Sequence, residues 1–353
     1  MSERVAGTYL LCGPDGCGRW LTALSFTALL NCEKPGLTEG EPAVAVPCGE
    51  CRNCRVIFEL NHEGLYFAMP LPPHKNEDQA IELTNEVLSR KREEPFAVLS
   101  SSANLTIPIS VGRRIKRDIG SRPAEGVYRA VIFYQMERMR PEAADALLKM
   151  IEEPPPRAVI LLIAERSELL LPTIQSRSQR VILRSSPYNV VADYLVEKHE
   201  VERERAALLS RVAEGIAGRA VEMAENDAEG AESRRMTGLA LFRSVYEESP
   251  PDTVDRIVQS VGERNRGEGE YLLHLWQSLL RDCTHLAVTG DEEGIVNVDF
   301  AADLKRLSSR FADPGIAAKG TDHIKITLEH FRRNVHIHGA LTSLVLKMKA
   351  DIA

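Results

Sequence analysis

A glycine-rich segment near the start of the chain has the spacing of a phosphate-binding loop. Residues 13–20 read GPDGCGRW, which matches G-x-x-x-x-G between a strand-like run and a helix-like run. A working loop then needs a lysine for the phosphates and a hydroxyl for Mg²⁺. Arg19 and Trp20 hold those positions; arginine is bulkier and planar, and tryptophan cannot bind magnesium. The segment is therefore either an ordinary glycine-rich turn or a phosphate loop that has lost its hydrolysis.

A second position bears on the same chemistry. Phosphate-loop ATPases carry an acidic residue at the end of a central strand, where it holds Mg²⁺. The apolar run over residues 128–134 predicts such a strand, and Tyr134 and Gln135 stand where the acidic pair would be expected. Because both magnesium positions are missing, we expect no intrinsic ATPase activity.

Four cysteines form a candidate metal site. Cys48, Cys51 and Cys54 follow the pattern C-x₂-C-x₂-C, and Cys32 precedes them. Four thiolates satisfy tetrahedral Zn²⁺ and leave no open position, so the site would be structural. An iron–sulfur cluster and a group of reduced thiols without metal remain alternatives, and His62 is the nearest alternative to Cys32 as the fourth ligand. The other three cysteines are expected to be buried or turn residues: Cys12, Cys17 and Cys283.

The elements that must position these residues alternate between strand and helix. Apolar runs predict strands at residues 8–12, 128–134, 158–164 and 180–183, with helical patterns between them. Continuous apolar strands that alternate with helices indicate a parallel sheet covered on both faces. After Pro187 the chain shows helical periodicity and no convincing strand, so the predicted class is α/β followed by all-α.

Composition excludes several classes of protein. The chain has 353 residues and a net charge of -7, which argues against a protein that coats DNA by bulk electrostatics. No apolar run reaches the roughly 18 residues of a spanning helix, and the first residues lack a signal-peptide pattern. We therefore expect a cytoplasmic protein with no membrane contact. Residues 113–117, RRIKR, are the densest basic stretch, which is either a solvated helix face or a contact to DNA phosphates.

One long segment carries a family resemblance. Residues 136–181, MERMRPEAADALLKMIEEPPPRAVILLIAERSELLLPTIQSRSQRV, closely resemble the clamp-loader branch of the AAA+ proteins. The most specific pieces are ADALLK at 144–149 and EEPP at 152–155. Residues 171–178 resemble the Ser-Arg-Cys motif of that branch, with Ser178 in place of the cysteine.

The retained Ser-Arg pair and the decayed loop together resemble a non-motor subunit of a bacterial clamp loader. This resemblance implies that Arg177, beside Ser176, acts in trans as an arginine finger on nucleotide held by a neighbouring subunit. Standing alone, an arginine at a helix end would be a member of a surface salt bridge. The expected subunit is part of a replicative DNA polymerase holoenzyme.

The same resemblance implies a degenerate nucleotide site. Gly13, Gly16, Gly18 and Arg19 would form it, with ATP not bound or bound weakly. Residues 215–220 resemble the second-sensor region of the family, in which Arg219 would reach nucleotide or serve only the structure. The resemblance also supports zinc on Cys32, Cys48, Cys51 and Cys54, because these subunits carry such a module.

Three domains are expected on this basis. They are an AAA+ type α/β domain at 1–186 with the zinc insert at 32–54, a helical lid at 187–234, and a helical collar at 235–353 that oligomerises. The implied partners are the motor and delta subunits, the sliding clamp, and primer–template DNA within the complex. The alternatives are an ATP-hydrolysing motor subunit and a stand-alone zinc-dependent nucleic-acid-binding protein.

Overall fold

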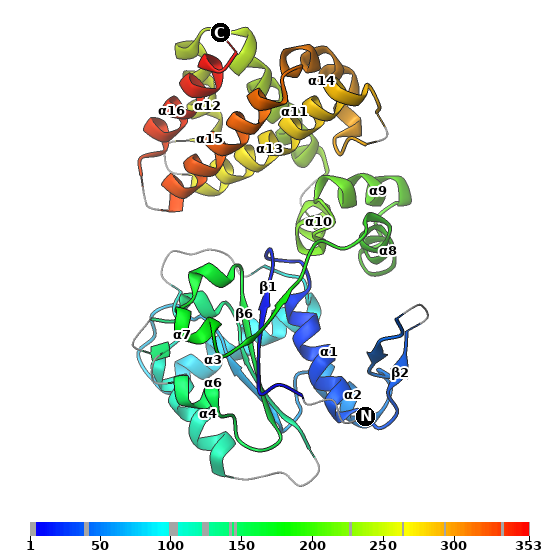
Figure 1. Cartoon of the computed structure of the whole chain (residues 1–353), viewed down its shortest axis with the longest axis vertical. Helices are drawn as coiled ribbons and strands as arrows, with labels where there is room; N and C mark the ends of the chain where they lie inside the picture. The colour runs from blue at the N-terminus through cyan, green and yellow to red at the C-terminus, as the bar shows by residue number, and fades with distance from the viewer. Residues whose placement is uncertain are drawn as a thin grey trace. The chain divides into compact units, whose positions relative to one another are not determined.

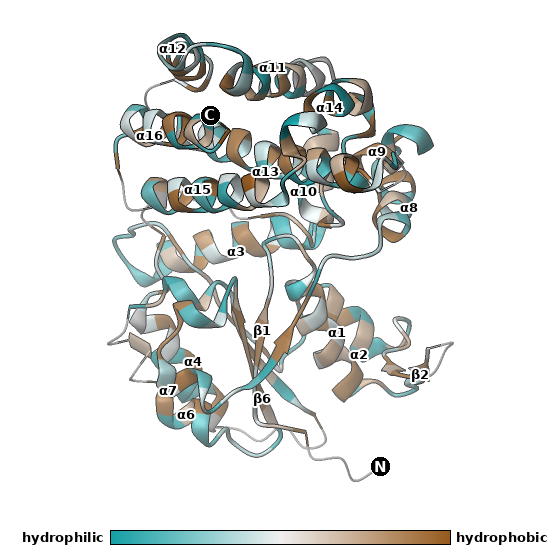
Figure 2. Cartoon of the chain, turned by 45° about the horizontal axis from the view of Figure 1, so that its top comes forward, coloured by the Kyte–Doolittle hydropathy of each residue, from teal (hydrophilic) through white to brown (hydrophobic). Residues whose placement is uncertain are grey.

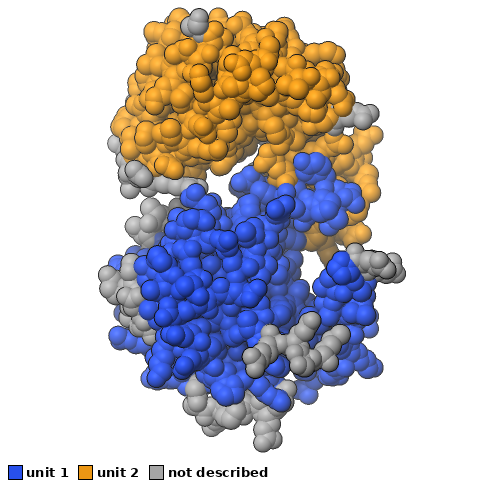
Figure 3. Space-filling view, in the orientation of Figure 1, with its two compact units in different colours: residues 1–191, 215–222 blue, residues 192–214, 223–353 orange. Residues whose placement is uncertain are grey.

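The structure is a computed structural model, drawn in Figure 1. It describes residues 5–38, 42–98, 105–121, 127–140, 143–144, 147–225, 228–262, 265–292, 294–332 and 335–352. Part of the predicted family motif ADALLK, residues 145 and 146, lies outside this set. The chain divides into two compact units: Met1–Val191 with Gly215–Glu222, and Ala192–Glu214 with Met223–Ala353 (Figure 3). The three-domain boundaries stay a prediction.

The first unit is built on a parallel five-stranded sheet. Its order is β4-β5-β6-β1-β7, and every neighbouring pair is parallel. β5 and β6 are buried along their whole length, as their continuous apolar sequences predict. Figure 2 shows β1 and β6 in the brown of hydrophobic residues. The strands are β1 (Thr8–Cys12), β4 (Leu65–Ala68), β5 (Arg129–Phe133), β6 (Ala158–Ala164) and β7 (Gln179–Ile182).

Helices cover both faces of this sheet, which confirms the predicted α/β class with a parallel sheet. Successive strand residues alternate between the faces: Leu10 packs with α4, α6 and α7, whereas Leu11 packs with α1 and α3. The helices are α1 (Arg19–Asn31), α2 (Arg52–Phe58), α3 (Glu77–Glu93), α4 (Ile109–Ser121), η1 (Met136–Arg138), α6 (Leu148–Glu152), η2 (Ser167–Leu169) and α7 (Pro172–Gln175).

Three short strands of this unit were missed by the sequence patterns. The zinc insert at 32–54, for which no strand was predicted, contains an antiparallel ribbon of β2 (Gly36–Leu37) and β3 (Ala45–Val46), and α2 begins within it. The short edge strand β4 owes its place to pairing with β5, in which Leu65 stands opposite Ala130. A strand of four residues is too short to show a hydrophobic periodicity, and its pairing with a distant strand cannot be read from the local sequence.

The described residues of the second unit form helices and their connections and include no strand, as predicted. Its core centres on Trp276, Phe242 and Phe311, and the Trp276 indole Nε1–H donates to the Gly238 carbonyl at 3.1 Å. None of the helices the structure describes combines the length and apolarity needed to cross a membrane. Helices α8 (Tyr188–His199) and α10 (Ala217–Glu225) each span the division between the units. The others are α9 (Arg203–Val212), α11 (Ala228–Glu247), α12 (Pro250–Val261), α13 (Arg266–Thr289), η3 (Val298–Phe300), α14 (Ala301–Ser308), η4 (Ser309–Phe311), α15 (Pro314–Arg332) and α16 (Ile337–Ala350).

Candidate functional site

The four predicted metal ligands converge. One sulfur atom from each of Cys32, Cys48, Cys51 and Cys54 lies within 4.8 Å of the others. The Cys48 and Cys54 sulfurs are 3.9 Å apart. A tetrahedron of sulfurs at a Zn–S distance of ~2.3 Å has edges of about 3.8 Å, so the donor set fits zinc in number, type and spacing.

Local structure builds this cysteine group. Cys32 ends α1, Cys51 caps the start of α2, and Cys54 lies in its first turn. Backbone N–H groups donate to the sulfurs, from Cys48 to Cys32 at 3.3 Å and from Cys51 to Cys48 at 3.3 Å. Hydrogen bonds from the backbone of Glu33 and Cys54 lower the pKa of Cys51 to about 6. These bonds favour the thiolate, which is the form that binds metal.

The remaining candidates lie outside the group. His62 is not among the converging ligands; its Nδ1 accepts the backbone N–H of Gly64 at 3.1 Å. Cys12, Cys17 and Cys283 are buried and belong to no cluster of metal ligands among the described residues. The structure therefore brings Cys32, and not His62, to the other three cysteines.

The glycine loop joins β1 to α1, but the two residues that replace its catalytic pair face inward. Arg19 is 3% exposed and forms an ion pair with Asp15, which lies in the loop itself. Trp20 packs against Phe67 and Tyr134, with ring centroids 5.5 and 5.8 Å away. The guanidinium is thus engaged within the loop and the indole is part of the core.

Backbone from elsewhere in the same unit covers the loop. The N–H of Gly218, in α10, donates to the Gly16 carbonyl at 3.1 Å. A Cβ added to Gly16 would lie 2.9 Å from the Gly218 Cα, and one added to Gly218 would lie 2.4 Å from the Phe96 carbonyl oxygen. The backbone segments at Gly16, Phe96 and Gly218 therefore lie in close contact, and Gly16 belongs to the glycine loop.

A buried lysine that the sequence patterns did not single out lies under this cover. Lys91, near the end of α3, is 3% exposed and donates to the carbonyls of Ala97 and Pro95. Its ammonium lies 4.7 Å from the Tyr134 ring centroid and 5.9 Å from that of Trp20. Burial, helped by the charge of Arg19, lowers the pKa of Lys91 to about 7. Lys91 lies among other charged residues in its helix, so its sequence neighbours give no indication that it is buried.

The end of β5 lacks an acidic pair in the structure as in the sequence. Tyr134 and Gln135 are both buried there, and burial raises the pKa of Tyr134 to about 12. The nearest following carboxylate, Glu137, accepts the backbone N–H of Glu165 at 3.2 Å. Burial raises the pKa of Glu137. Glu137 lies in η1, two residues after Gln135, so it was not considered as the acidic residue at the strand end.

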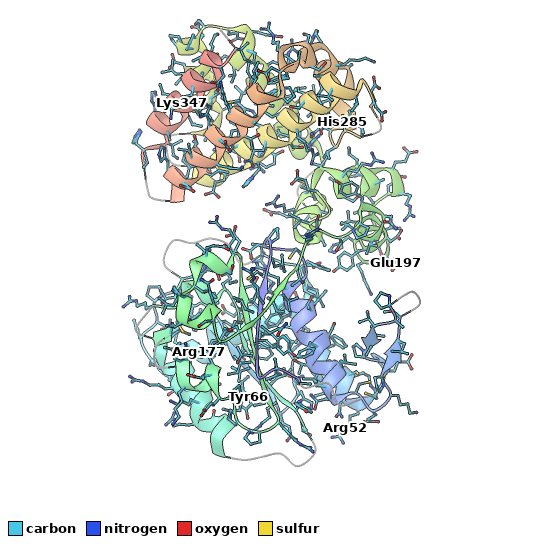
Figure 4. All side chains as sticks on the ribbon, in the orientation of Figure 1. Arg52, Tyr66, Arg177, Glu197, His285 and Lys347 are labelled. Carbon is cyan, nitrogen blue, oxygen red and sulfur yellow. The ribbon has the colours of Figure 1, made fainter. Side chains whose placement is uncertain are left out.

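The Ser-Arg pair lies just after α7, at the surface of the first unit, where Figure 4 labels Arg177. The Arg177 side chain is 35% exposed; its Nε–H donates to Glu152 at 2.9 Å and its Nη1 donates to the Thr173 carbonyl at 3.1 Å. The hydroxyl of Ser176 donates to the same carbonyl at 3.2 Å. This arginine is therefore both exposed and oriented.

Two further predicted contacts have distinct settings. Arg219 is half-buried and follows Gly218 in α10. Its helix lies against the glycine loop, because the Gly218 N–H donates to the Gly16 carbonyl. In α4 the side chains of Arg113, Lys116 and Arg117 are exposed, whereas Arg114 pairs with Glu77 at 3.4 Å. The basic stretch is thus a solvated helix face in this chain, available to a polyanion.

Comparison with known proteins gives a consistent picture. A family model described as "DNA polymerase III, delta subunit" matches residues 1–187. The DNA polymerase III subunit delta-prime of Bacillus subtilis is 25% identical, over 98% of this chain and 92% of that protein. The subunit of the same name from Pseudomonas aeruginosa is 30% identical over 49% of this chain and 41% of its own length. A gamma subunit-related structure from Thermotoga maritima aligns over 99% of this chain and 95% of its own, at 17% identity and a TM-score of 0.36.

Proposed function

The chain belongs to the delta-prime family of DNA polymerase III clamp-loader subunits, and we propose that it is a member that hydrolyses no ATP itself and supplies Arg177 to a neighbouring subunit. The observation that carries the proposal is the contrast between two sites of one unit. Its own glycine loop is covered by backbone, while Arg177 is exposed just after α7. The subunit would work in the cytoplasm, where the chromosome is replicated.

The absence of hydrolysis follows from the loop and the strand end. Hydrolysis of ATP needs a cation on the β- and γ-phosphates, a hydroxyl on Mg²⁺ and an acidic residue that holds the metal. In this chain Arg19 is paired with Asp15, Trp20 is in the core, and Tyr134 is a neutral phenol. The contact between Gly16 and Gly218 also covers the loop. We infer that ATP is bound weakly or not at all, and that Arg219 serves the packing of α10.

The arginine-finger role follows from charge and access. A transferring γ-phosphoryl group develops negative charge that an arginine supplied in trans can stabilise. Arg177 has the exposure for this, and the family resemblance of its Ser-Arg motif assigns the same role. Ser176 would hold the turn, because its hydroxyl donates to the Thr173 carbonyl that Arg177 also uses.

Zinc would serve the structure and not the reaction. Cys32, Cys48, Cys51 and Cys54 would hold it, and four thiolate ligands leave no position for a substrate. Because Cys32 ends α1 while Cys51 and Cys54 lie at the start of α2, these ligands would tie the two helices together on either side of the β2–β3 ribbon when they bind the ion. The amide of Asn53 adds to that connection by donating to the Asn31 carbonyl at 2.9 Å.

Partners and domain roles follow from the same proposal. The second unit would contain most of the lid and the collar that assembles with motor and delta subunits. The complex would place the sliding clamp on primer–template DNA, and Arg113, Lys116 and Arg117 would contact only phosphates. An acidic chain with one basic helix face suits a protein whose main partners are other proteins.

Reconstitution tests the function. With motor and delta subunits, clamp and primed DNA, the Arg177→Ala variant should lose the ATPase of one site and slow clamp loading. A finger in trans is worth ~10³–10⁵-fold at its own site, so that site falls nearly silent while the others continue. The exposed Arg184→Ala is the matched control and should behave as wild type. Unchanged loading by a folded Arg177→Ala complex would refute the proposal, and saturable ATP binding by the isolated chain would point to a motor subunit.

A further inference from the structure

The ion pair between Arg177 and Glu152 assigns a role to a residue that the function has not used so far. We propose that Glu152 is a positioning residue that holds the Arg177 guanidinium in the orientation required by the neighbouring ATP site. The inference rests on the proposed finger role of Arg177. Glu152 ends α6 and Arg177 lies two residues after the end of α7, so the contact joins residues that are 25 positions apart in the sequence.

The geometry of the guanidinium supports this role. Arginine carries five N–H donors in a rigid planar fork. The bonds to the Glu152 carboxylate and the Thr173 carbonyl use Nε and one hydrogen of Nη1. Among the described residues, Arg177 donates these two hydrogen bonds, so both Nη2 hydrogens and the second Nη1 hydrogen remain for a ligand. A guanidinium donates N–H groups of this kind to phosphoryl oxygens.

The two helices that carry the pair are anchored in the sheet domain. Ile151, next to Glu152, is 1% exposed, and its carbonyl accepts the Thr8 hydroxyl of β1 at 2.7 Å. Ile174, in α7, is also 1% exposed. Because α6 is fixed in this way, the Glu152 carboxylate restricts the rotamers of the Arg177 side chain. The entropy cost of ordering that side chain is then met before the neighbour's nucleotide binds.

The pair is solvent-exposed, which sets the size of the effect. The Arg177 and Glu152 side chains are 35% and 53% exposed, so their attraction is screened by water. An exposed pair of this kind changes an equilibrium by about two- to fivefold. Loss of Glu152 should therefore weaken the finger without abolishing it.

The reconstituted complex provides the assay, with the steady-state ATPase measured in the presence of clamp and primed DNA. The quantity to compare is the Arg177-dependent rate, which is the wild-type rate minus the rate of Arg177→Ala. We expect Glu152→Ala to lower this rate two- to fivefold with little change in the KM for ATP. Glu152→Gln keeps an oxygen acceptor for the Nε–H and should recover part of the loss. The exposed neighbour Glu153→Ala is the matched control and should equal wild type.

A double variant separates positioning from general stability. Because Glu152 acts through Arg177, Glu152→Ala should lower the ATPase no further in an Arg177→Ala background. A further drop there, or a wild-type or faster rate for Glu152→Ala alone, overturns the positioning role; the faster rate would identify Glu152 as a latch. If Arg177→Ala itself has no effect, the finger proposal fails and this inference fails with it. If only Arg177→Ala has an effect, the finger proposal stands and this inference fails.

Discussion

Lys91 makes the stability of the first unit depend on pH in a direction that can be worked out. Its pKa falls from 10.5 to about 7 in the folded protein, first because of burial and then because of the Arg19 charge. Between these pH values the unfolded chain binds a proton that the folded chain does not. The free energy of unfolding contributed by this group therefore rises with pH from about 7 to 10.5 and is lost as pH falls through 7.

The perturbation is Lys91→Met, which keeps much of the side-chain volume and removes the titration. Each pH unit within the window is worth about 1.4 kcal/mol. From pH 7 to pH 9 the wild type should gain roughly 2–3 kcal/mol of unfolding free energy relative to the variant. The substitution also leaves the Ala97 and Pro95 carbonyls without their donor, but that cost does not depend on pH. The slope of the difference is therefore the quantity to test.

The two tryptophans of the chain make a unit-specific assay possible. Trp20 lies beneath Lys91 in the first unit, and Trp276 lies in the core of the second. In a Trp276→Phe background, urea unfolding followed by fluorescence reports the first unit alone. Lys116→Met, which removes an exposed lysine from the same unit, is the matched control and should show a flat difference. A flat or falling difference for Lys91→Met would refute the reasoning.

Two further predictions concern the metal group and the covered loop. The purified protein should contain one zinc per chain by elemental analysis; Cys54→Ser or chelation should remove it and lower the unfolding free energy of the first unit by several kcal/mol, whereas Cys283→Ser should keep it. Zinc-free protein of unchanged stability would contradict this. Gly16→Ala places a Cβ 2.9 Å from the Gly218 Cα at a φ of +81° and should cost about 1–3 kcal/mol. Gly290→Ala, at a φ of +70° with nothing within 4 Å, lies in the second unit and should cost less when the fluorescence of Trp276 reports its unfolding in a Trp20→Phe background. Equal costs would show that the loop is not closely covered.

Much of the fold follows from patterns in the sequence. The runs at residues 8–12, 128–134 and 158–164 are continuously apolar. This pattern is typical of strands that are covered on both faces, so the residue types alone predict that they are buried. Strand β4 was missed because its stability comes from a partner far along the chain.

The candidate site divides in the same way. The spacing of the cysteines predicted a four-ligand group, and in the structure the sulfur atoms of these residues lie close together: Cys32, Cys48, Cys51 and Cys54. The residues at Arg19, Trp20, Tyr134 and Gln135 predicted a loop without magnesium chemistry, because the missing groups are a matter of residue type. The role of Arg177 remains a prediction of its motif, although its exposure is now a structural observation.

What the sequence by itself determined is therefore the set of chemical groups: which thiols can bind a metal, which hydroxyl and carboxylates are absent, and which runs must be buried. Only the tertiary structure decided which segments that are distant in the sequence contact one another. Gly218 lies against Gly16, Lys91 lies over Trp20, and Glu152 holds Arg177. Residue type and spacing act locally and can be read along the chain, whereas these contacts depend on how the helices pack on the two faces of one sheet.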